Sequence, residues 1–522
     1  MDALIAGCFS AAMLCIAVVV IFFYDSTNFN GKSYKGGFLL DLRLLSGIVL
    51  AVLALSALWI GRWRRLHPLR EEARLRPAHL ALAFLGLFAL QLFIGYNIYS
   101  LQSGDMYSVL QSAFSLARGE TQYVCYDYFE IYPNNIPITA LYASALKLWM
   151  RTGAEPSLER FAAMLMALQC AGGALAGTAY MALAVRLTGR RSAAFAMLGG
   201  YTALIALSGW MSVPYSDPAV LAVPALTAWL DLRSRESAGW GGRLGFSALA
   251  GLIGGAGMMI KPQSTMVLCA VLFCEALGWL LDKARRTRAS ALRFSVVLCA
   301  FLAMYGPVRG AICDASGLNA HAEGRVSKLH YLYMGLGENT NGGYTAADYI
   351  TLEDAPTYEA RQERYAAGIR ARVKEMGPWR LLVHAQRKCL IGFSDGTFAW
   401  GINGHEHSAP KNGTVSPLLR SIFWEDGSYN PLLTLLQQGV WLAVLMLCPL
   451  AGFAVLRQRR SGRATCADSM RVLLVSALGF VAFSLLFESG GRYTLVMAPV
   501  FVLIAVCAIT RREARTADGA GA

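Results

Sequence analysis

Residues 78–98 read AHLALAFLGLFALQLFIGYNI and contain no Asp, Glu, Lys or Arg. A run of this kind crosses the hydrocarbon core of a bilayer as one helix, for which about 20 apolar residues are needed. The next residues, 99–107, read YSLQSGDMY and contain an acid, Asp105, seven residues after the end of the predicted span. An ionisable group where a chain leaves the bilayer is costly and marks a candidate functional site. The stretch therefore predicts a membrane-spanning helix that leads into a functional surface.

The rest of the chain repeats this apolar pattern. Of its 522 residues 56% are hydrophobic and 15% are charged, and the mean hydropathy is +0.44. This composition excludes one soluble domain and predicts an all-α, polytopic helical membrane protein. We expect about twelve transmembrane helices. The predicted spans are residues 3–23, 42–60, 78–98, 160–185, 193–212, 217–232, 244–260, 263–281, 292–308, 432–455, 471–488 and 494–510.

The spans and the loops between them divide the chain into four parts. The first span has no basic segment before it and no small-residue cleavage site, so we expect a membrane anchor rather than a secretory signal. Residues 1–77 hold two peripheral spans and a basic loop, and residues 78–308 hold the transmembrane core with its first outer loop, 99–159. Residues 309–431 form a long outer loop or cap, and residues 432–522 form the last spans and the tail.

The location of the positive charges predicts the orientation. The net charge is +14, and Arg and Lys gather in residues 61–76, 186–191, 233–243, 283–293, 457–471 and 511–515. Short loops that are rich in Arg and Lys stay in the cytoplasm, so we expect both termini there and residues 99–159 and 309–431 outside. Basic residues scattered between spans do not indicate a nucleic-acid partner. The Arg- and Ala-rich sequence suggests the bacterial plasma membrane, with the endoplasmic reticulum as the alternative.

Three outer-face features leave alternatives open. Residues 136–150 are apolar but short, and we favour a re-entrant or interfacial helix over a span, which would turn the basic loops outward. Cys125 and Cys313 either form a disulfide or remain free. His405 and His407 lack a third metal ligand, and no other metal spacing is evident. We therefore predict no metal site and no firm cofactor, although the sequence does not exclude a divalent metal.

Polar residues gather at the expected outer ends of four segments. They are Asp105 with Tyr126-Asp127-Tyr128-Phe129-Glu130, then Tyr215-Ser216-Asp217-Pro218, Lys261-Pro262-Gln263, and Glu488-Ser489-Gly490-Gly491-Arg492-Tyr493. With the predicted orientation, these charges share one depth of the membrane. Plainer structural roles compete with function, since Asp105 suits the N-cap of a helix that begins at Met106. Lys261 and Arg492 also suit cations that extend to the membrane interface.

With these motifs the chain resembles the GT-C superfamily of polyprenyl-phosphate-sugar-dependent integral membrane glycosyltransferases. The nearest branch holds the protein mannosyltransferases and the aminoarabinose transferases. The resemblance covers most of residues 78–510 as a pattern. The matching residues are Asp105, Ala113, Gly119, Tyr128, Phe129, Glu130, Pro133, Asp217, Pro218, Lys261, Arg492 and Tyr493. The chain departs from the family at Met106, where many relatives carry a second acid, and at Ile131, where aminoarabinose transferases carry a Lys.

The resemblance implies an inverting transfer of a sugar from a polyprenyl-phosphate donor to a glycan, glycolipid or protein of the cell envelope. Asp105 would be the general base that takes the acceptor's proton. Lys261 and Arg492 would stabilise the phosphate leaving group. The substrate-binding candidates are Asp127, Tyr128, Glu130, Asn134, Asp217, Lys261, Glu488, Arg492 and Tyr493, with Trp400 as a further sugar contact.

Two other functions compete with the transferase. A transporter or flippase of a lipid-linked or small polar substrate suits twelve spans, but it would carry its charges near the bilayer midplane, and these lie at one rim. A catalytically inactive assembly partner is the third candidate, because Asp105 stands without an adjacent acid.

Overall fold

The structure is a computed structural model that describes residues 2–23, 42–66, 75–99, 104–283, 286–318, 326–351, 354–401, 416–424, 426–460 and 464–510. These residues form helices and turns and contain no β-strand, as the all-α prediction expected. The helices are α1 (Asp2–Phe22), α2 (Leu42–Leu66), α3 (Pro77–Ile98), α4 (Gly104–Arg118), α5 (Tyr126–Ile131), α6 (Ile136–Met150), α7 (Leu158–Thr188), α8 (Arg191–Tyr201), α9 (Ser216–Ala219), α10 (Ala222–Glu236), α11 (Trp240–Ile260), α12 (Met266–Leu281), α13 (Arg288–Ala303), α14 (Arg309–Ser316), α15 (Leu329–Gly335), α16 (Tyr358–Phe393), α17 (Pro417–Phe423), α18 (Asn430–Leu447), α19 (Ala451–Arg460), α20 (Ala464–Leu486) and α21 (Ala498–Ile509).

Within the described ranges, eight helical stretches are long and apolar enough to cross a membrane. They are Asp2–Phe22, Pro77–Ile98, Leu158–Thr188, Trp240–Ile260, Pro262–Leu281, Arg288–Ser316, Asn430–Phe453 and Thr465–Leu486. Each overlaps a predicted span, so the membrane class is confirmed, whereas the count of twelve is not.

The four remaining predicted spans correspond to shorter or interrupted helices. The apolar parts Arg43–Trp59 of α2 and Ala498–Ile509 of α21 are short. The stretch 193–212 is broken, because α8 ends at Tyr201 and gives way to a π-helical turn and the 3-10 helix η4 (Gly209–Ser212). The stretch 217–232 is split between α9 and α10. Pro218 and Pro224 lack the backbone N–H that a continuous helix needs in its interior.

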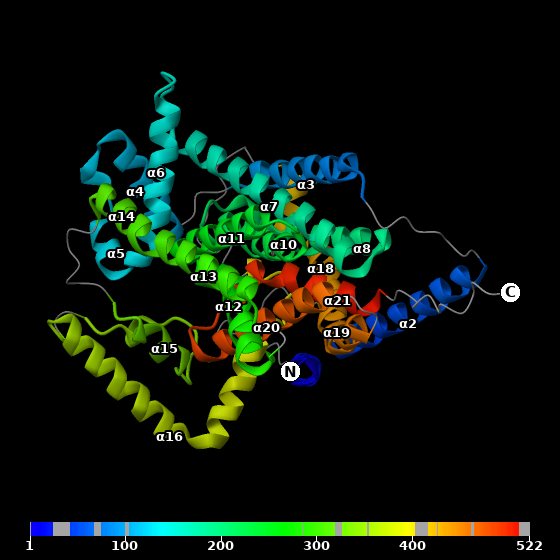
Figure 1. Ribbon diagram of the computed structural model, residues 1–522. Helices are drawn as coiled ribbons and strands as arrows, with labels where there is room; N and C mark the ends of the chain where they lie inside the picture. Colours follow the sequence, from blue (N-terminus) through cyan, green and yellow to red (C-terminus); the bar gives the residue numbers. More distant parts are fainter. Residues whose placement is uncertain are drawn as a thin grey trace.

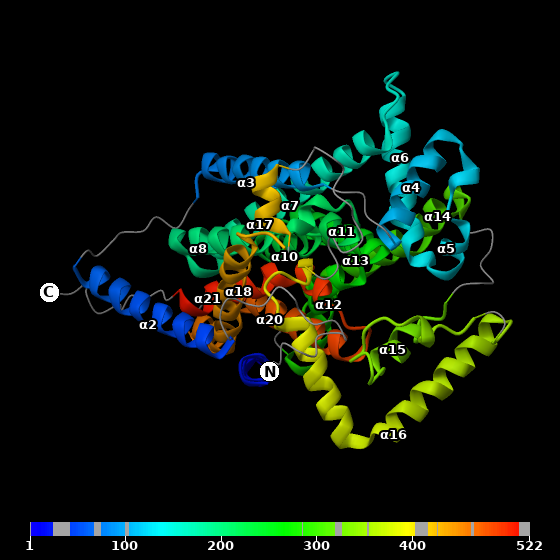
Figure 2. The same ribbon diagram turned by 180° about the vertical axis from the view of Figure 1, so that it is seen from behind.

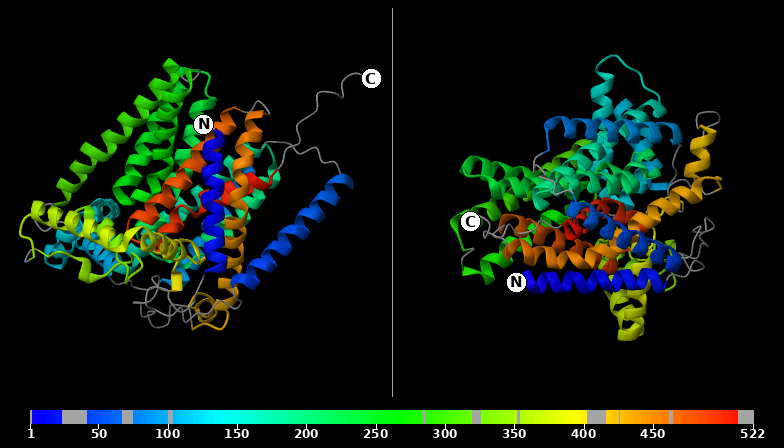
Figure 3. Two further views of the ribbon diagram at one scale, coloured as in Figure 1. Left: turned by 90° about the horizontal axis from the view of Figure 1, so that it is seen from below. Right: turned by 90° about the vertical axis from the view of Figure 1, so that its right-hand side faces the viewer.

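The core of the bundle surrounds α21, in which residues 498–508 are all buried. Gly177 of α7 faces Leu87 and Tyr201, and Gly251 of α11 faces the backbone of α13, so that small residues allow close helix packing. Figure 2 shows α17 leading into α18, whose Trp441 and Leu442 are buried in the core. Helix α2 projects away from the bundle (Figures 1 and 3), and its Leu58 and Trp59 are exposed.

Two segments cover one end of the bundle (Figure 1). Helices α4, α5, α6 and α14 gather on one side of this end, and α15 and α16 on the other. The predicted span 292–308 runs on through α13, the π-helical η7 (Met304–Val308) and α14, so that helical structure continues across the expected boundary at residue 309. The predicted short helix from Tyr365 to Met376 is part of α16, which bends at Gly377. Gly377 has φ 59°, a left-handed conformation that a residue without Cβ adopts readily.

Helix α6 and the two outer cysteines address the open alternatives. Helix α6 covers 15 residues and packs between α4 and α14, and it is not among the candidate spans of the described chain. Cys125 and Cys313 are both free thiols, so no disulfide joins them. His405 and His407 lie outside the described residues.

A buried ionic network joins α10, α12, α13 and α20 at the other end of the bundle. The Arg293 guanidinium lies 2.8 Å from the Asp231 carboxylate and 3.1 Å from that of Glu275. The Arg235 guanidinium contacts the same two acids at 2.8 and 2.7 Å. The basic segments 233–243 and 283–293, which predict the membrane orientation, thus also contribute side chains to the interior.

Candidate functional site

The site lies at the opposite end of the bundle from the ionic network. It forms at the start of α9, the end of α11 and the end of α20. Asp217 lies in α9, before the start of α10, whereas Asp231 lies in the second half of α10, so the site and the ionic network are at opposite ends of this helix. Lys261 separates α11 from the 3-10 helix η5 (Pro262–Thr265). Pro262 keeps the residue before it out of the helical region, and Lys261 accordingly has φ −150° and ψ 106°.

Asp217 is fully buried between two cations. The Lys261 Nζ lies 2.9 Å from its Oδ1, and the Arg492 Nε lies 3.3 Å from its Oδ2. Arg492 belongs to the 3-10 helix η12 (Gly491–Val496), which follows α20. A buried charge is tolerated when it is paired, so each member of this triad requires the others. Asp217 is the acid that both cations contact directly.

Aromatic rings surround the two cations. The Lys261 Nζ lies 4.7 Å from the centre of the Tyr493 ring. The Arg492 guanidinium lies 5.5 Å from the ring centre of Tyr215 and 5.7 Å from those of Trp210 and Tyr493. Cation–π contacts of this kind hold a cation in place without neutralising it.

Asp105 stands at the exposed edge of this arrangement. It lies in the first turn of α4, and its Oδ2 accepts a long hydrogen bond of 3.5 Å from the Tyr215 hydroxyl. Because α4 begins at Gly104, Asp105 is inside the helix and is not its N-cap, which argues against the capping role. We call Asp105, Asp217, Lys261, Glu488 and Arg492 the charged cluster.

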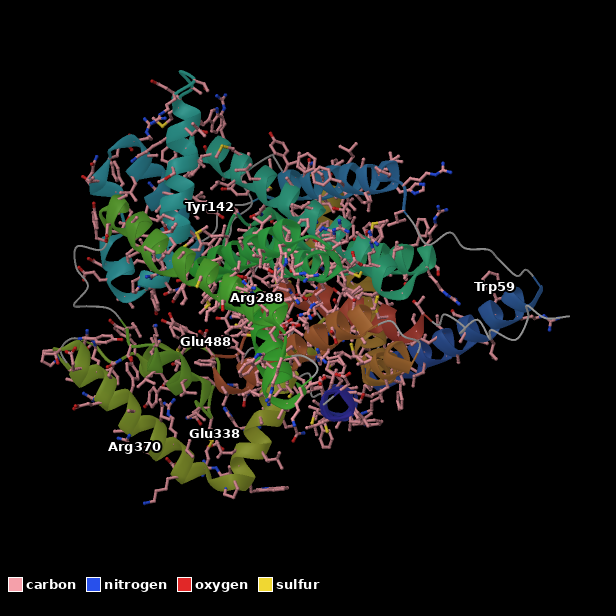
Figure 4. The ribbon with its side chains drawn as sticks, in the orientation of Figure 1. Trp59, Tyr142, Arg288, Glu338, Arg370 and Glu488 are labelled. Atoms are coloured by element: carbon pink, nitrogen blue, oxygen red, sulfur yellow. The ribbon has the colours of Figure 1, made fainter. Side chains whose placement is uncertain are left out.

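Glu488 joins the cluster from the end of α20 and is half-buried. Figure 4 places it where α20 meets α15. Burial raises the pKa of the Glu488 carboxyl, while the Tyr493 hydroxyl and the two nearby cations, Arg492 and Lys261, act in the opposite direction.

The segment after α5 adds aromatic and amide groups. The Asn135 side-chain amide donates a hydrogen bond to the Tyr128 hydroxyl. The Tyr331 hydroxyl donates to the Asn134 Oδ1 at 3.2 Å, and the Tyr128 and Tyr132 rings lie 5.4 Å apart. Burial raises the pKa of the Tyr128 hydroxyl, and the neighbouring Tyr215 and Asp105 raise it further. Tyr128 and Asn134 therefore lie beside the charged cluster.

Three predicted contacts lie elsewhere. Asp127 is exposed on α5, and Glu130 of the same helix is half-buried and lies near Tyr349. Trp400 is buried, its ring packs against Trp210 at 5.6 Å, and its Nε1 donates to the Phe423 carbonyl. The expectation that Trp400 stacks on a sugar is therefore wrong, because its ring is already packed.

Sequence reasoning missed several residues at the site. Trp210 and Tyr331 carry no sequence signal that separates them from other aromatic residues. Lys388 of α16 is almost completely buried, and a lysine followed by the apolar run CLIGF was the available sign. Among the residues that the structure describes, no group of three or more His, Cys, Asp or Glu side chains is placed to hold a metal.

A family model described as "Conserved hypothetical integral membrane protein" matches residues 5–512. The chain belongs to this family. Among solved structures, the archaeal oligosaccharyltransferase AglB from Archaeoglobus fulgidus, in complex with an inhibitory peptide and a dolichol-phosphate, is similar at 14% identity with a TM-score of 0.37. The match covers 81% of this chain and 50% of that one, so the chain spans about half of AglB. No curated protein matches the sequence.

Proposed function

We propose that the chain is an integral membrane glycosyltransferase, which moves a sugar from a polyprenyl-phosphate donor to an acceptor of the cell envelope. One observation carries the proposal. An exposed carboxylate, Asp105, contacts the Tyr215 hydroxyl next to Arg492, and Arg492 and the buried Lys261 share the buried acid Asp217. A base and an anion-stabilising pair within one site are the groups that this transfer needs.

The reaction uses the two sides of the site differently. The acceptor hydroxyl oxygen forms a bond to the anomeric carbon of the sugar while Asp105 takes the hydroxyl proton. The bond between the anomeric carbon and the phosphate oxygen breaks, and its electron pair leaves with the polyprenyl phosphate. Lys261 and Arg492 stabilise the negative charge that develops on that phosphate. The configuration at the anomeric carbon is inverted, as in a single displacement.

The remaining candidates surround these groups. Asp217 holds Lys261 and Arg492 at the site, and Tyr493 covers the Lys261 ammonium. Tyr128, Asn134 and Glu488 are proposed to contact the sugar or the acceptor, and Asp127 and Glu130 to lie at the outer edge of the acceptor path.

The location of the site follows from the same proposal. We assign it to the extracytoplasmic face of a bacterial plasma membrane, with both termini in the cytoplasm. The ionic network of Asp231, Glu275 and their arginines then lies on the cytoplasmic side, where basic loops are retained. The elements α4 to α6 and α14 to α16 form an outer cap over the site.

The experiment compares Asp105→Asn with the wild type in transfer from labelled polyprenyl-phosphate-sugars to an envelope extract. Glu363→Gln is the matched control, since it also converts a carboxylate to an amide and this residue is exposed on α16. We expect a loss of roughly 100-fold or more for Asp105→Asn, the range for a general base, and no loss for the control. Transfer by Asp105→Asn at the wild-type rate would refute the base, and absence of transfer by the wild type would refute the donor.

The transporter is the weaker candidate, because the charged cluster lies at the helix ends and not in the middle of α10 or α12. Uptake or flipping of the labelled lipid by the wild type in vesicles, without transfer, would reverse this preference.

A further inference from the structure

A buried lysine, Lys388, takes no part in the proposed reaction. It lies in the second half of α16 and is 1% exposed. Its Nζ donates to the Gly335 carbonyl at 2.8 Å and to the Phe487 carbonyl at 2.6 Å. These carbonyls end two different helices, α15 and α20. Two of the three donors of one ammonium group thus join distant parts of the chain.

Gly335 lies in residues 329–344, which we call the lid segment. The lid segment lies near the charged cluster, since Tyr331 is close to Glu488 and Asp105. Its Tyr331 hydroxyl donates to Asn134 on one side, and its Gly342 carbonyl accepts from the Ser489 N–H at 2.7 Å on the other. Beyond Gly342, Tyr344 lies near Tyr132. The segment is therefore supported on both sides of the site.

The Phe487 carbonyl leads directly into the site. The next residue is Glu488, and Arg492 and Tyr493 follow in η12. Lys388, Glu488, Ser489 and Tyr493 also line one small cavity of about 10 Å³, so the lysine and this segment face each other directly. The bond to Phe487 consequently fixes the point at which the segment with Glu488 and Arg492 begins.

The two hydrogen bonds to backbone carbonyls stabilise the Lys388 ammonium in its buried surroundings. Burial lowers the pKa of the Lys388 ammonium to about 7, and Glu488 acts against this decrease. Its neighbours His384 and Cys389 lie on the same helix. Because burial disfavours the charge, the amine gains most from the two carbonyls that it contacts.

We propose that Lys388 is a positioning residue that ties the lid segment and residues 487–493 into one unit. A substrate that displaces the lid segment at Gly335 then also shifts Glu488 and Arg492, so that entry is coupled to the arrangement of the cluster. The catalytic meaning of this coupling rests on the proposed transferase. The physical link itself does not, and it is measured separately.

His384 provides a comparison variant, because it contacts the lid segment but not Phe487 in the structure. Its Nε2 also lies 2.9 Å from the Gly335 carbonyl, one helical turn from Lys388. The hydrogen bonds of His384 in the structure support the lid side, whereas those of Lys388 support both sides. Arg370, exposed on the first half of α16 (Figure 4), serves as the matched control for loss of a basic side chain.

The test is amide hydrogen exchange by mass spectrometry on the full-length protein in nanodiscs, at one pH and temperature. In Lys388→Met, peptides from 335–343 and from 487–493 are both expected to exchange roughly tenfold faster or more, because two charge-assisted bonds are lost. In His384→Leu, only residues 335–343 become faster, and in Arg370→Met neither segment changes. A Lys388→Met effect confined to one segment, or absent from both, would overturn the proposal.

A second variant covers the case in which Lys388→Met does not fold. Lys388→Gln keeps an amide donor, and a smaller rise in both segments is expected, whereas a rise in only one segment would again overturn the link. Sugar transfer by the same variants is measured in parallel, and Lys388→Met is expected to raise KM more than it lowers kcat. If wild-type transfer is absent while the joint exchange pattern appears, the proposed function fails and the link stands.

Discussion

Replacing Asp217 by Asn removes the one carboxylate that two buried cations share. The Asp217 side chain is 0% exposed, and the changed amide keeps its size and shape. We expect this single change to destabilise the chain more than removal of either cation, because both Lys261 and Arg492 lose their partner at once.

The magnitude follows from the two distances. At an effective dielectric constant near 20, unit charges 2.9 and 3.3 Å apart attract by about 6 and about 5 kcal/mol. The full sum is not expected to appear, because Lys261 can lose its proton and water can reach the site. Arg492 has no such escape, since a guanidinium stays protonated in proteins. Breaking a buried pair from one side costs about 3–5 kcal/mol, and this is the loss that we expect for Asp217→Asn.

The assay is equilibrium unfolding of purified protein in detergent, for the wild type, Asp217→Asn, Lys261→Met and the double variant. Lys261→Met leaves one acid facing one cation, and we expect it to cost about 1–2 kcal/mol less than Asp217→Asn. The double variant should be at least about 1 kcal/mol more stable than the sum of the single losses predicts, as for residues in contact. An Asp217→Asn protein within about 0.5 kcal/mol of the wild type, or strictly additive variants, would refute the shared-acid interpretation.

Three further variants test the outer segments and the opposite end of the bundle. Burial lowers the pKa of the His330 imidazole from 6.5 to about 4, so its contribution to stability is present above pH 6.5 and is lost as the pH falls towards 4. In wild-type protein this protonation lowers the free energy of unfolding by up to about 3 kcal/mol between pH 6.5 and 4, and His330→Phe should lack this loss in an acid unfolding series. An unchanged pH profile would contradict it. Gly335→Ala places a methyl group against the Leu486 and Phe487 backbone, so we expect a loss of about 1–3 kcal/mol and faster proteolysis near residue 335; wild-type resistance would count against this packing. Glu275→Gln leaves Arg235 and Arg293 with less negative charge, and its melting temperature should fall as for a buried pair that loses about 3–5 kcal/mol; an unchanged melting temperature would show that the network does not stabilise the fold.

Sequence reasoning located the charged cluster because each member follows the end of an apolar span. Asp105, Asp217, Lys261, Glu488 and Arg492 could be placed at one depth from the alternation of basic and non-basic loops alone. Sequence reasoning could not predict which of these charges pair, because the contact of Lys261 with Asp217 depends on how α9 and α11 pack. The same holds for Lys388, whose two carbonyl partners come from helix ends that only the fold brings together.

The predicted count of twelve spans is not confirmed, for a different physical reason. Hydropathy is averaged along the chain and does not depend on where a helix ends. An apolar segment made of two short helices therefore has the same hydropathy as one continuous membrane span. Residues 193–212 are such a stretch, and they place Trp210 beside Arg492 where a straight helix would not. The irregular backbone is buried in protein, where its polar groups find partners, as in the bond from Gln169 to the Met211 carbonyl.

The two ends of α10 and α12 differ in how their charges are balanced, and this difference bears on function. At one end, Arg235 and Arg293 each lie between Asp231 and Glu275, so that both cations are satisfied from two sides within the network. At the other end, Lys261 and Arg492 share Asp217 as their directly paired acid, the Glu488 carboxyl lies nearby, and aromatic faces flank both cations. A closed network suits a structural clamp, whereas two cations that share one directly paired acid keep hydrogen-bond donors for a further anion. In the proposed reaction, the donor phosphate binds these two cations, and Asp105 at the exposed edge is left for the acceptor hydroxyl.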